Sequence, residues 1–257
     1  MNRPAPAHQH QPAVLRQPVM PRPNRLFQTS TMAAILDAVY DGDVSVADLL
    51  RHGDFGVGTF DALDGEMIIS EGIVRQFRSE GQANEVHETQ RTPFACVTRF
   101  LPEDTFSLVQ PLDKTDFESL INERIGNPNV ICAVRFTGDF IDVQTRTVFV
   151  QSPPYPKMLD VVARQPTMAF GPTRGTMLGF RSPHYMQGLS VAGFHLHFLD
   201  QEARRGGHVL DYRVGRGLVE LAVISDIELR LPRTMQFAEA DLNPADLHEA
   251  IRIAEGE

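Results

Sequence analysis

One stretch restricts the fold more than any other: residues 188–212, GLSVAGFHLHFLDQEARRGGHVLDY. Side chains alternate between the two faces of an extended strand, so residues two apart point the same way. Residues 193–200 follow this alternation, with Phe194, Leu196 and Phe198 on one face and two histidines on the other. A charged segment with a pair of glycines follows, and then a second apolar run begins. The pattern predicts a strand, a turn and a returning strand.

The histidines of this stretch are candidate metal ligands. His195 and His197 share a strand face, with their Cα atoms roughly 7 Å apart, and His208 opens the returning strand. If the two strands pair as a hairpin, the three imidazoles converge. Three histidines and an open fourth position form a catalytic zinc site, although other divalent metals also accept nitrogen ligands. The alternative is that all three are ordinary residues of an exposed sheet face.

Strand-like segments outnumber helical ones along the rest of the chain. Ser30 or Thr31 is a candidate cap for a first helix, and Ser45 for a second helix that ends near Gly53. Further helices are expected in residues 114–125, after Pro156, and at the C-terminus, where a tail is the alternative. The sequence therefore predicts an α+β fold with mixed, largely antiparallel sheets in two closely packed subdomains. The candidate metal site lies on a β-hairpin of the C-terminal half.

Several strand pairings follow from turn signals. Asp64-Gly65 predicts a hairpin turn, and residues 93–100 and 104–110 are expected to pair around residues 101–104. Residues 129–150 are expected to form two strands around Gly138-Asp139. Near the histidines, the Gly206-Gly207 pair belongs to the expected turn.

The composition of the ends and of one internal segment indicates the domain organisation. Residues 1–25 are rich in Pro, Gln and His, and are expected to be a disordered tail. Residues 26–257 are expected to form the folded domain. Within it, residues 151–156 (QSPPYP) are a possible boundary between subdomains.

Charge and apolar runs exclude some classes of partner. The net charge of −9 argues against nucleic acid, and no apolar run is long enough for a membrane span. The N-terminus lacks the apolar core of a signal peptide. Cys96 and Cys132 both lie in apolar, strand-like runs and are expected to be buried, unpaired thiols. This cysteine usage fits a reducing compartment, and a cytoplasmic location is the expectation.

The histidine stretch resembles a known family once its flanking motifs are included. GFHLHFLD followed by RRGGHVLDY is similar to the signature of the α-acetolactate decarboxylases. GDFGVGTFDALDGEMI, TRTVFVQSPPYP and GTMLGFRSPHYMQGLSVAGFHLHF agree in order and spacing. The resemblance extends from about Met32 to the C-terminus. It departs from the family where Thr147, Val148 and Phe149 follow the arginine of the second motif without the proline that is often found there.

The resemblance implies a site assembled from distant segments. It implies that His195, His197 and His208 hold zinc or another divalent ion, and that Glu66, Arg146 and Glu255 are catalytic. Glu257 is the alternative to Glu255. Arg146 is also the expected partner of the substrate carboxylate or of the enediolate, and Thr59 is a further expected substrate contact. The family also implies a homodimer.

The implied reaction converts 2-acetolactate to acetoin and CO₂. A metal acting as a Lewis acid would stabilise the enediolate left by CO₂ loss, and a carboxyl within hydrogen-bond reach would protonate it stereoselectively. Either glutamate can be this donor or a metal ligand. No organic cofactor is implied, since GVGTF is not a dinucleotide fingerprint. The alternative function is another three-histidine metal enzyme on a related scaffold, for example a hydrolase.

Overall fold

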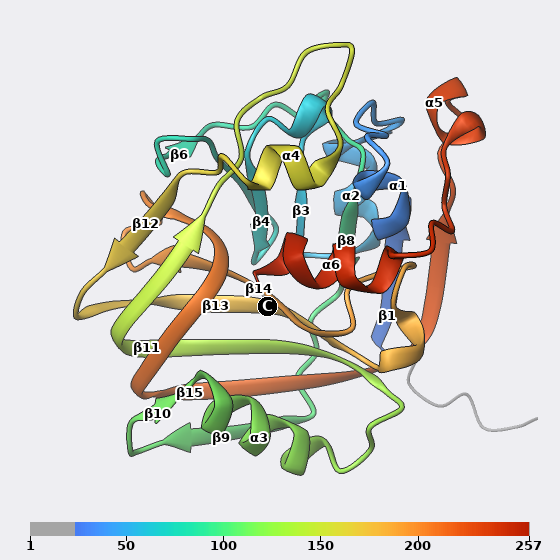
Figure 1. Cartoon of the computed structure of the whole chain (residues 1–257). Coiled ribbons are helices and arrows are strands. Elements are labelled where there is room, and N and C mark those ends of the chain that lie inside the picture. Colours follow the sequence, from blue (N-terminus) through green and yellow to red (C-terminus); the bar gives the residue numbers. More distant parts are fainter. Residues whose placement is uncertain (1–23, 257) are drawn as a thin grey trace, which may run out of the picture.

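The computed structural model describes residues 24–256, and these residues form a strongly curled sheet with helices on both sides (Figure 1). Thirteen of the strands belong to one sheet, and β2 and β7 form a separate pair. The predicted tail and Glu257 lie outside the described residues, except that Asn24 and Arg25 belong to β1. The strands are β1 (Asn24–Thr29), β2 (Val44–Ser45), β3 (Phe55–Thr59), β4 (Glu66–Ser70), β5 (Ile73–Phe77), β6 (Ala83–Asn84), β7 (Arg91–Thr92), β8 (Ala95–Thr98), β9 (Asp104–Leu108), β10 (Leu112–Asp113), β11 (Ile131–Arg146), β12 (Thr167–Phe170), β13 (Thr173–Ser182), β14 (Gly193–Asp200) and β15 (Gly206–Arg230).

The helices begin and end largely where capping residues predict. Thr31 caps α1 (Met32–Leu36) and Ser45 caps α2 (Val46–His52), each accepting a backbone N–H with its side-chain oxygen. The other helices are α3 (Lys114–Ile125), α4 (Met158–Val162), α5 (Met235–Glu239) and α6 (Leu247–Glu255), with short 3₁₀ turns at η1 (Asp61–Leu63) and η2 (His184–Met186). In residues 24–256, no helix is long and apolar enough to cross a membrane.

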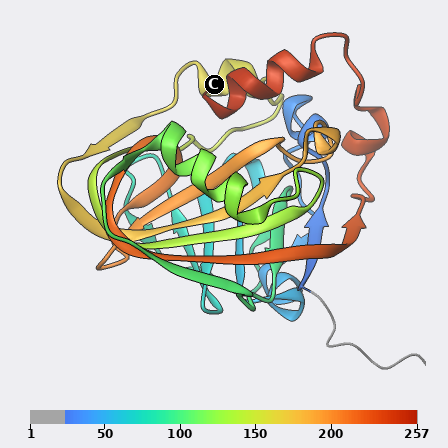
Figure 2. The ribbon, with the colours of Figure 1, turned by 90° about the horizontal axis from the view of Figure 1, so that it is seen from below.

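The predicted α+β class with largely antiparallel pairing is confirmed. Among the paired strands described, only β1 and β15 run parallel. Strand β11 pairs with β13 on one side and β15 on the other, and β14 lies between β13 and β15. These four strands close on themselves, and Figure 2 shows the resulting curl. Residues 151–156 connect β11 to α4, and the subdomain boundary expected there stays a prediction.

Two pairings predicted from local turn signals are wrong, and one pair of glycines lies outside the turn that was expected to contain it. The strands β8 and β9 do not form a hairpin: β8 pairs with β1 and β3, whereas β9 pairs with β15. Residues 131–146 form one strand with irregular register after Gly138, instead of two strands around a turn. Gly206 and Gly207, which were expected in the hairpin turn, instead begin β15 and pair with β14.

Glycines in β11 and β15 allow these two strands to approach each other closely at the point where a turn was expected. Gly138 lies opposite Gly217, and a Cβ on Gly217 would lie 2.5 Å from the Phe136 ring. The strands therefore bend around aromatic side chains. Phe117 of α3 meets Phe136, and Phe140 meets Phe198, both edge to face.

Helix α3 packs on one face of the curled sheet, and three other helices cover the opposite face. Helices α1, α4 and α6 contact one another and pack on a second apolar cluster. In α6, Leu247, Ile251 and Ala254 are buried at helical spacing. These helices come from distant parts of the chain and lie close together (Figure 1), and Glu255 at the end of α6 lies near two of the histidines.

Candidate functional site

The β14–β15 hairpin brings the three histidines together. His197 lies directly opposite His208 in the antiparallel ladder, and His195 shares the face of His197. The ring centroids lie 5.1, 5.2 and 5.3 Å apart. All three residues are buried, and one ring nitrogen from each lies within 4.8 Å of the corresponding atoms of the other two. The predicted convergence of the imidazoles is therefore present.

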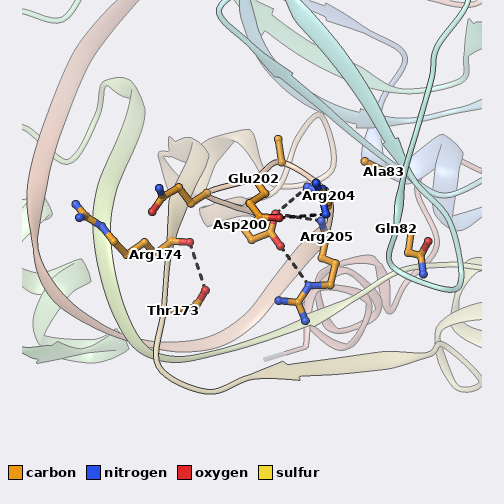
Figure 3. A pocket seen from close by; sticks show the side chains of 10 residues that line it. Gln82, Ala83, Thr173, Arg174, Asp200, Glu202, Arg204 and Arg205 are labelled. Atoms are coloured by element: carbon orange, nitrogen blue, oxygen red, sulfur yellow. Dashed lines mark hydrogen bonds and ion pairs between the residues drawn. The ribbon is translucent and has the colours of Figure 1, made fainter.

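The turn that closes this hairpin is held by Asp200. Its Oδ1 accepts the backbone N–H groups of Arg204 and Arg205 at 2.8 and 3.2 Å, and its Oδ2 accepts Nε of Arg205 at 3.2 Å. Figure 3 shows these contacts at the wall of a hollow of about 810 Å³. Charged side chains of this hollow, including Arg174 and Glu202, pair with neighbouring groups. The residues that line this hollow therefore include those of the turn that precedes His208.

Gly207 is required by the backbone beside His208. A Cβ at this position would lie 2.4 Å from the carbonyl oxygen of Arg146. Its φ of +158° is also one that other residues rarely adopt. The glycine therefore lets β15 approach β11 closely at the point where both carry site residues.

The same register places Arg146 in the site. Arg146 is the cross-strand partner of His208 on the β11 side, just as His197 is on the β14 side. Directly opposed residues point to one face of a sheet, so these three side chains form a row. Only 2 % of the Arg146 side chain is exposed. A guanidinium buried in this way needs anionic or acceptor partners.

Glu255 reaches the site from the last residue of α6. It lies eight residues after Leu247 on α6, and the helical period places it on the same buried face. Its carboxylate oxygens lie 3.8 Å from Nη2 of Arg146, 3.9 Å from Nε2 of His195 and 3.6 Å from Nε2 of His208. Gly256 ends the helix in the left-handed conformation. The position of Glu255 was predicted from family resemblance, and the helix explains it.

Glu66 and Thr59 reach the site from the N-terminal half. They are direct partners in the β3–β4 ladder and share a face. Oε2 of Glu66 lies 3.7 Å from Nε2 of His197. The Thr59 hydroxyl donates to the carbonyl of Gly65 at 2.7 Å, so its oxygen retains lone pairs for a second contact. All seven residues predicted for the site thus lie around one buried region.

Burial changes the charge state of these groups. It raises the pKa of Glu66 to about 7; nearby Arg146 opposes this shift and Glu255 adds to it. Burial lowers the pKa of His195, and lowers those of His197 and His208 well below the usual value. The histidines are therefore neutral at physiological pH, and neutral imidazole is the form that binds a metal.

The polar atoms of the site fit a metal ion. Both ring nitrogens of His197, Nδ1 of His208 and Oε2 of Glu255 are buried without a hydrogen-bond partner among the described residues. Buried polar atoms normally have partners, and their absence is costly. Three neutral imidazoles with adjacent carboxylates are a donor set suited to a divalent cation.

The remaining wall of the site is apolar and was not assigned from sequence. It is formed by side chains of α1, α4 and the loops beside them: Met32, Ile35, Leu63, Phe94, Val148 and Met158. Met32 and Ile35 lie three residues apart on α1 and are both buried. Nothing in local sequence distinguishes a core side chain from one that lines a small cavity, because both follow the same apolar pattern.

Comparison with known proteins agrees with this geometry. Residues 26–244 match the family model described as alpha-acetolactate decarboxylase. The chain belongs to this family. Alpha-acetolactate decarboxylase of Raoultella terrigena is 42% identical over 90% of this chain and 89% of its own length, and that of Bacillus subtilis is 40% identical over 91% of both chains.

Solved structures lead to the same family. The crystal structure of alpha-acetolactate decarboxylase from Bacillus subtilis strain 168 superposes with a TM-score of 0.89 at 40% identity, covering 91% of this chain and all of that one. A Staphylococcus aureus protein similar to the family superposes with a TM-score of 0.86 at 31% identity, over 90% of this chain and 100% of its own. The fold is therefore that of the alpha-acetolactate decarboxylase family. The family model ends at residue 244, so Glu255 lies beyond the segment that it matches.

Proposed function

We propose that this family member decarboxylates 2-acetolactate to acetoin and CO₂ with a divalent metal held by His195, His197 and His208. The names of its relatives state the decarboxylation of alpha-acetolactate. The observation that supports it in this chain is the buried triad beside Arg146, whose Nε has no hydrogen-bond partner among the described residues. The histidine ligands favour zinc, although other divalent ions accept the same donors.

The pocket suits a small, branched 2-hydroxy-3-oxo acid. Arg146 offers a charged, planar fork for the substrate carboxylate or for the oxygens that gain charge as CO₂ leaves. Thr59 lines the same pocket, and its hydroxyl would be a further substrate contact. The apolar wall suits the two methyl groups of the substrate. These groups orient the C–C bond that breaks and exclude water around it.

The chemistry then requires an electron sink and a proton. The electron pair of the broken bond moves to the adjacent ketone, giving an enediolate, and a proton returns to the carbon that lost CO₂. A divalent ion held by the three histidines would supply Lewis-acid stabilisation of the oxygens that become negative. Glu66 lies near His197, whereas Glu255 lies near His195 and His208, and a fixed carboxyl on one side of the enediolate would protonate it stereoselectively.

The assembly and location of the enzyme are also proposals. We expect a homodimer, as the family implies, and a cytoplasmic location. Both cysteines are free and buried, which is compatible with a reducing compartment. Light scattering on the purified chain measures the oligomeric state directly.

The activity is tested by acetoin release. Purified protein loaded with zinc is incubated with racemic 2-acetolactate, and acetoin and CO₂ are measured before and after chelation. We expect stoichiometric products, loss of activity on metal removal and recovery on adding zinc back. Full activity in rigorously metal-free protein would rule out the metal mechanism, and ester or amide hydrolysis without acetoin formation would favour the hydrolase alternative.

A further inference from the structure

Arg146 is held by a single hydrogen bond within residues 24–256. Its Nη1 donates to Oε1 of Gln165 at 3.0 Å. Its Nε is buried without a partner, and its Nη2 lies 3.8 Å from Glu255, which is beyond hydrogen-bonding distance. A guanidinium carries five N–H donors, so most of its donors remain available to a ligand.

Gln165 is itself fixed by the backbone around it. It follows α4, and its N–H donates to the carbonyl of Val162 at 3.2 Å. The next residue, Pro166, accepts the N–H of Thr147 at 3.1 Å, and Thr167 pairs with Arg146 in the β11–β12 ladder. The amide therefore approaches the guanidinium from a segment bound to the same strand end.

The charge of the partner matters because of the carboxylates already present. Glu66 and Glu255 both lie near Arg146. A third carboxylate would offset the positive charge that attracts an anionic substrate, whereas an amide oxygen accepts the hydrogen bond without adding charge.

We propose that Gln165 is a positioning residue for substrate binding, which orients the Arg146 guanidinium through a neutral hydrogen bond and leaves its charge free for the substrate carboxylate. This inference rests on the proposed function, because it assigns the substrate anion to Arg146. The effect of Gln165 passes entirely through Arg146. Its loss leaves the metal ligands, which lie on other strands, unchanged.

Binding of an unreactive anion tests this without turnover. The probe is the 2,3-dihydroxy analogue of acetolactate, which lacks the ketone that accepts electrons. Its Kd is measured by calorimetry with zinc-loaded wild type, Gln165→Leu, Gln165→Glu, Arg146→Ala and the double variant Arg146→Ala/Gln165→Leu. Gln151→Leu is the matched control, because Gln151 donates to the nearby carbonyl of Phe149 and does not contact Arg146. Zinc content and Tm are recorded for each protein.

We expect Gln165→Leu to raise Kd and lower kcat/KM by about 10- to 100-fold with full zinc content, and Gln151→Leu to change neither. In the Arg146→Ala background, Gln165→Leu should change Kd less than two-fold, because the partner it positions is gone. Gln165→Glu keeps a hydrogen-bond acceptor for Arg146 and should preserve Tm. Its added negative charge should raise the Kd of the anionic analogue.

Three results would overturn the inference. They are wild-type binding in Gln165→Leu, an equal loss of binding with and without Arg146, or wild-type binding in Gln165→Glu, which would remove the role of its neutrality. The proposed function fails separately, if the wild-type enzyme binds the analogue but releases no acetoin from acetolactate.

Discussion

His197 and His208 face each other across the β14–β15 ladder, so the register of one hairpin determines whether two of the three candidate ligands meet. A shift of one residue would turn His208 to the other face of the sheet. The opposite edge of β15 adds Arg146 by the same rule. The register of β15 with its two neighbouring strands therefore aligns His197, His208 and Arg146 in one row.

Replacing a histidine of the triad should remove the metal. In His208→Ala, two imidazoles remain, and we expect substoichiometric zinc after dialysis and acetoin formation at least about 100-fold below wild type. Elemental analysis and an acetoin assay measure the two effects. His184→Ala, an exposed histidine outside the triad, is the control and should retain zinc and activity. Equal zinc content in His208→Ala would contradict the assignment.

Gly207→Ala should disturb the site without changing any functional side chain. The added Cβ would meet the carbonyl of Arg146 at 2.4 Å, so β11 and β15 must separate where Arg146 and His208 lie. We expect a lower Tm, measured by calorimetry, and weaker zinc binding. Gly171→Ala is the control, because its Cβ would meet nothing within 4 Å. Unchanged zinc affinity and Tm in Gly207→Ala would show that the strands tolerate the clash.

Glu66→Gln should lower turnover more than it lowers metal binding. The amide keeps the shape of the side chain beside His197 but neither binds an ion as a carboxylate nor donates an acidic proton. We expect kcat to fall by about 10²–10⁴-fold with most of the zinc retained. Glu71→Gln, at an exposed position, serves as the comparison. A variant with normal kcat would exclude Glu66 from catalysis.

Met158→Ala should broaden the substrate range. Met158 is a buried residue of the apolar wall, and its truncation leaves space for a longer alkyl group. The ratio of kcat/KM for the 2-ethyl analogue to that for acetolactate should rise by about 10-fold or more, as expected for one methylene. Met235→Ala, with Met235 72% exposed, should leave the ratio unchanged. If both variants keep the wild-type ratio, Met158 does not limit substrate size.

The two thiols should be unreactive in the folded protein. Burial raises the pKa of both Cys96 and Cys132 to about 12. The thiolate is the reactive form and its fraction rises with pH, so at pH 8 almost none is present. A chromogenic disulfide reagent should label no thiol at pH 8 until denaturant is added, when two are released. Rapid labelling of the native protein would contradict the buried positions.

The sequence by itself determined the local features of this protein. The two-residue period puts His195 and His197 on one face, and capping residues mark the starts of α1 and α2. The α+β class follows from the number of strand-like segments. Glu66, Arg146 and Glu255 were predictable only through family resemblance, because a single acidic or basic residue has no local pattern that distinguishes a site from a surface.

Only the tertiary structure decided the long-range relationships. The pairing of β9 with β15, the continuity of β11 through Gly138 and the contact of Gln165 with Arg146 join segments far apart in the chain. The turn signals near residues 101–104 and 138–139 were real local preferences, but longer ladders and aromatic packing outweighed them. Strand pairing depends on which partners bury the most apolar surface in a shared register. That choice belongs to the whole chain and is not encoded within any one segment.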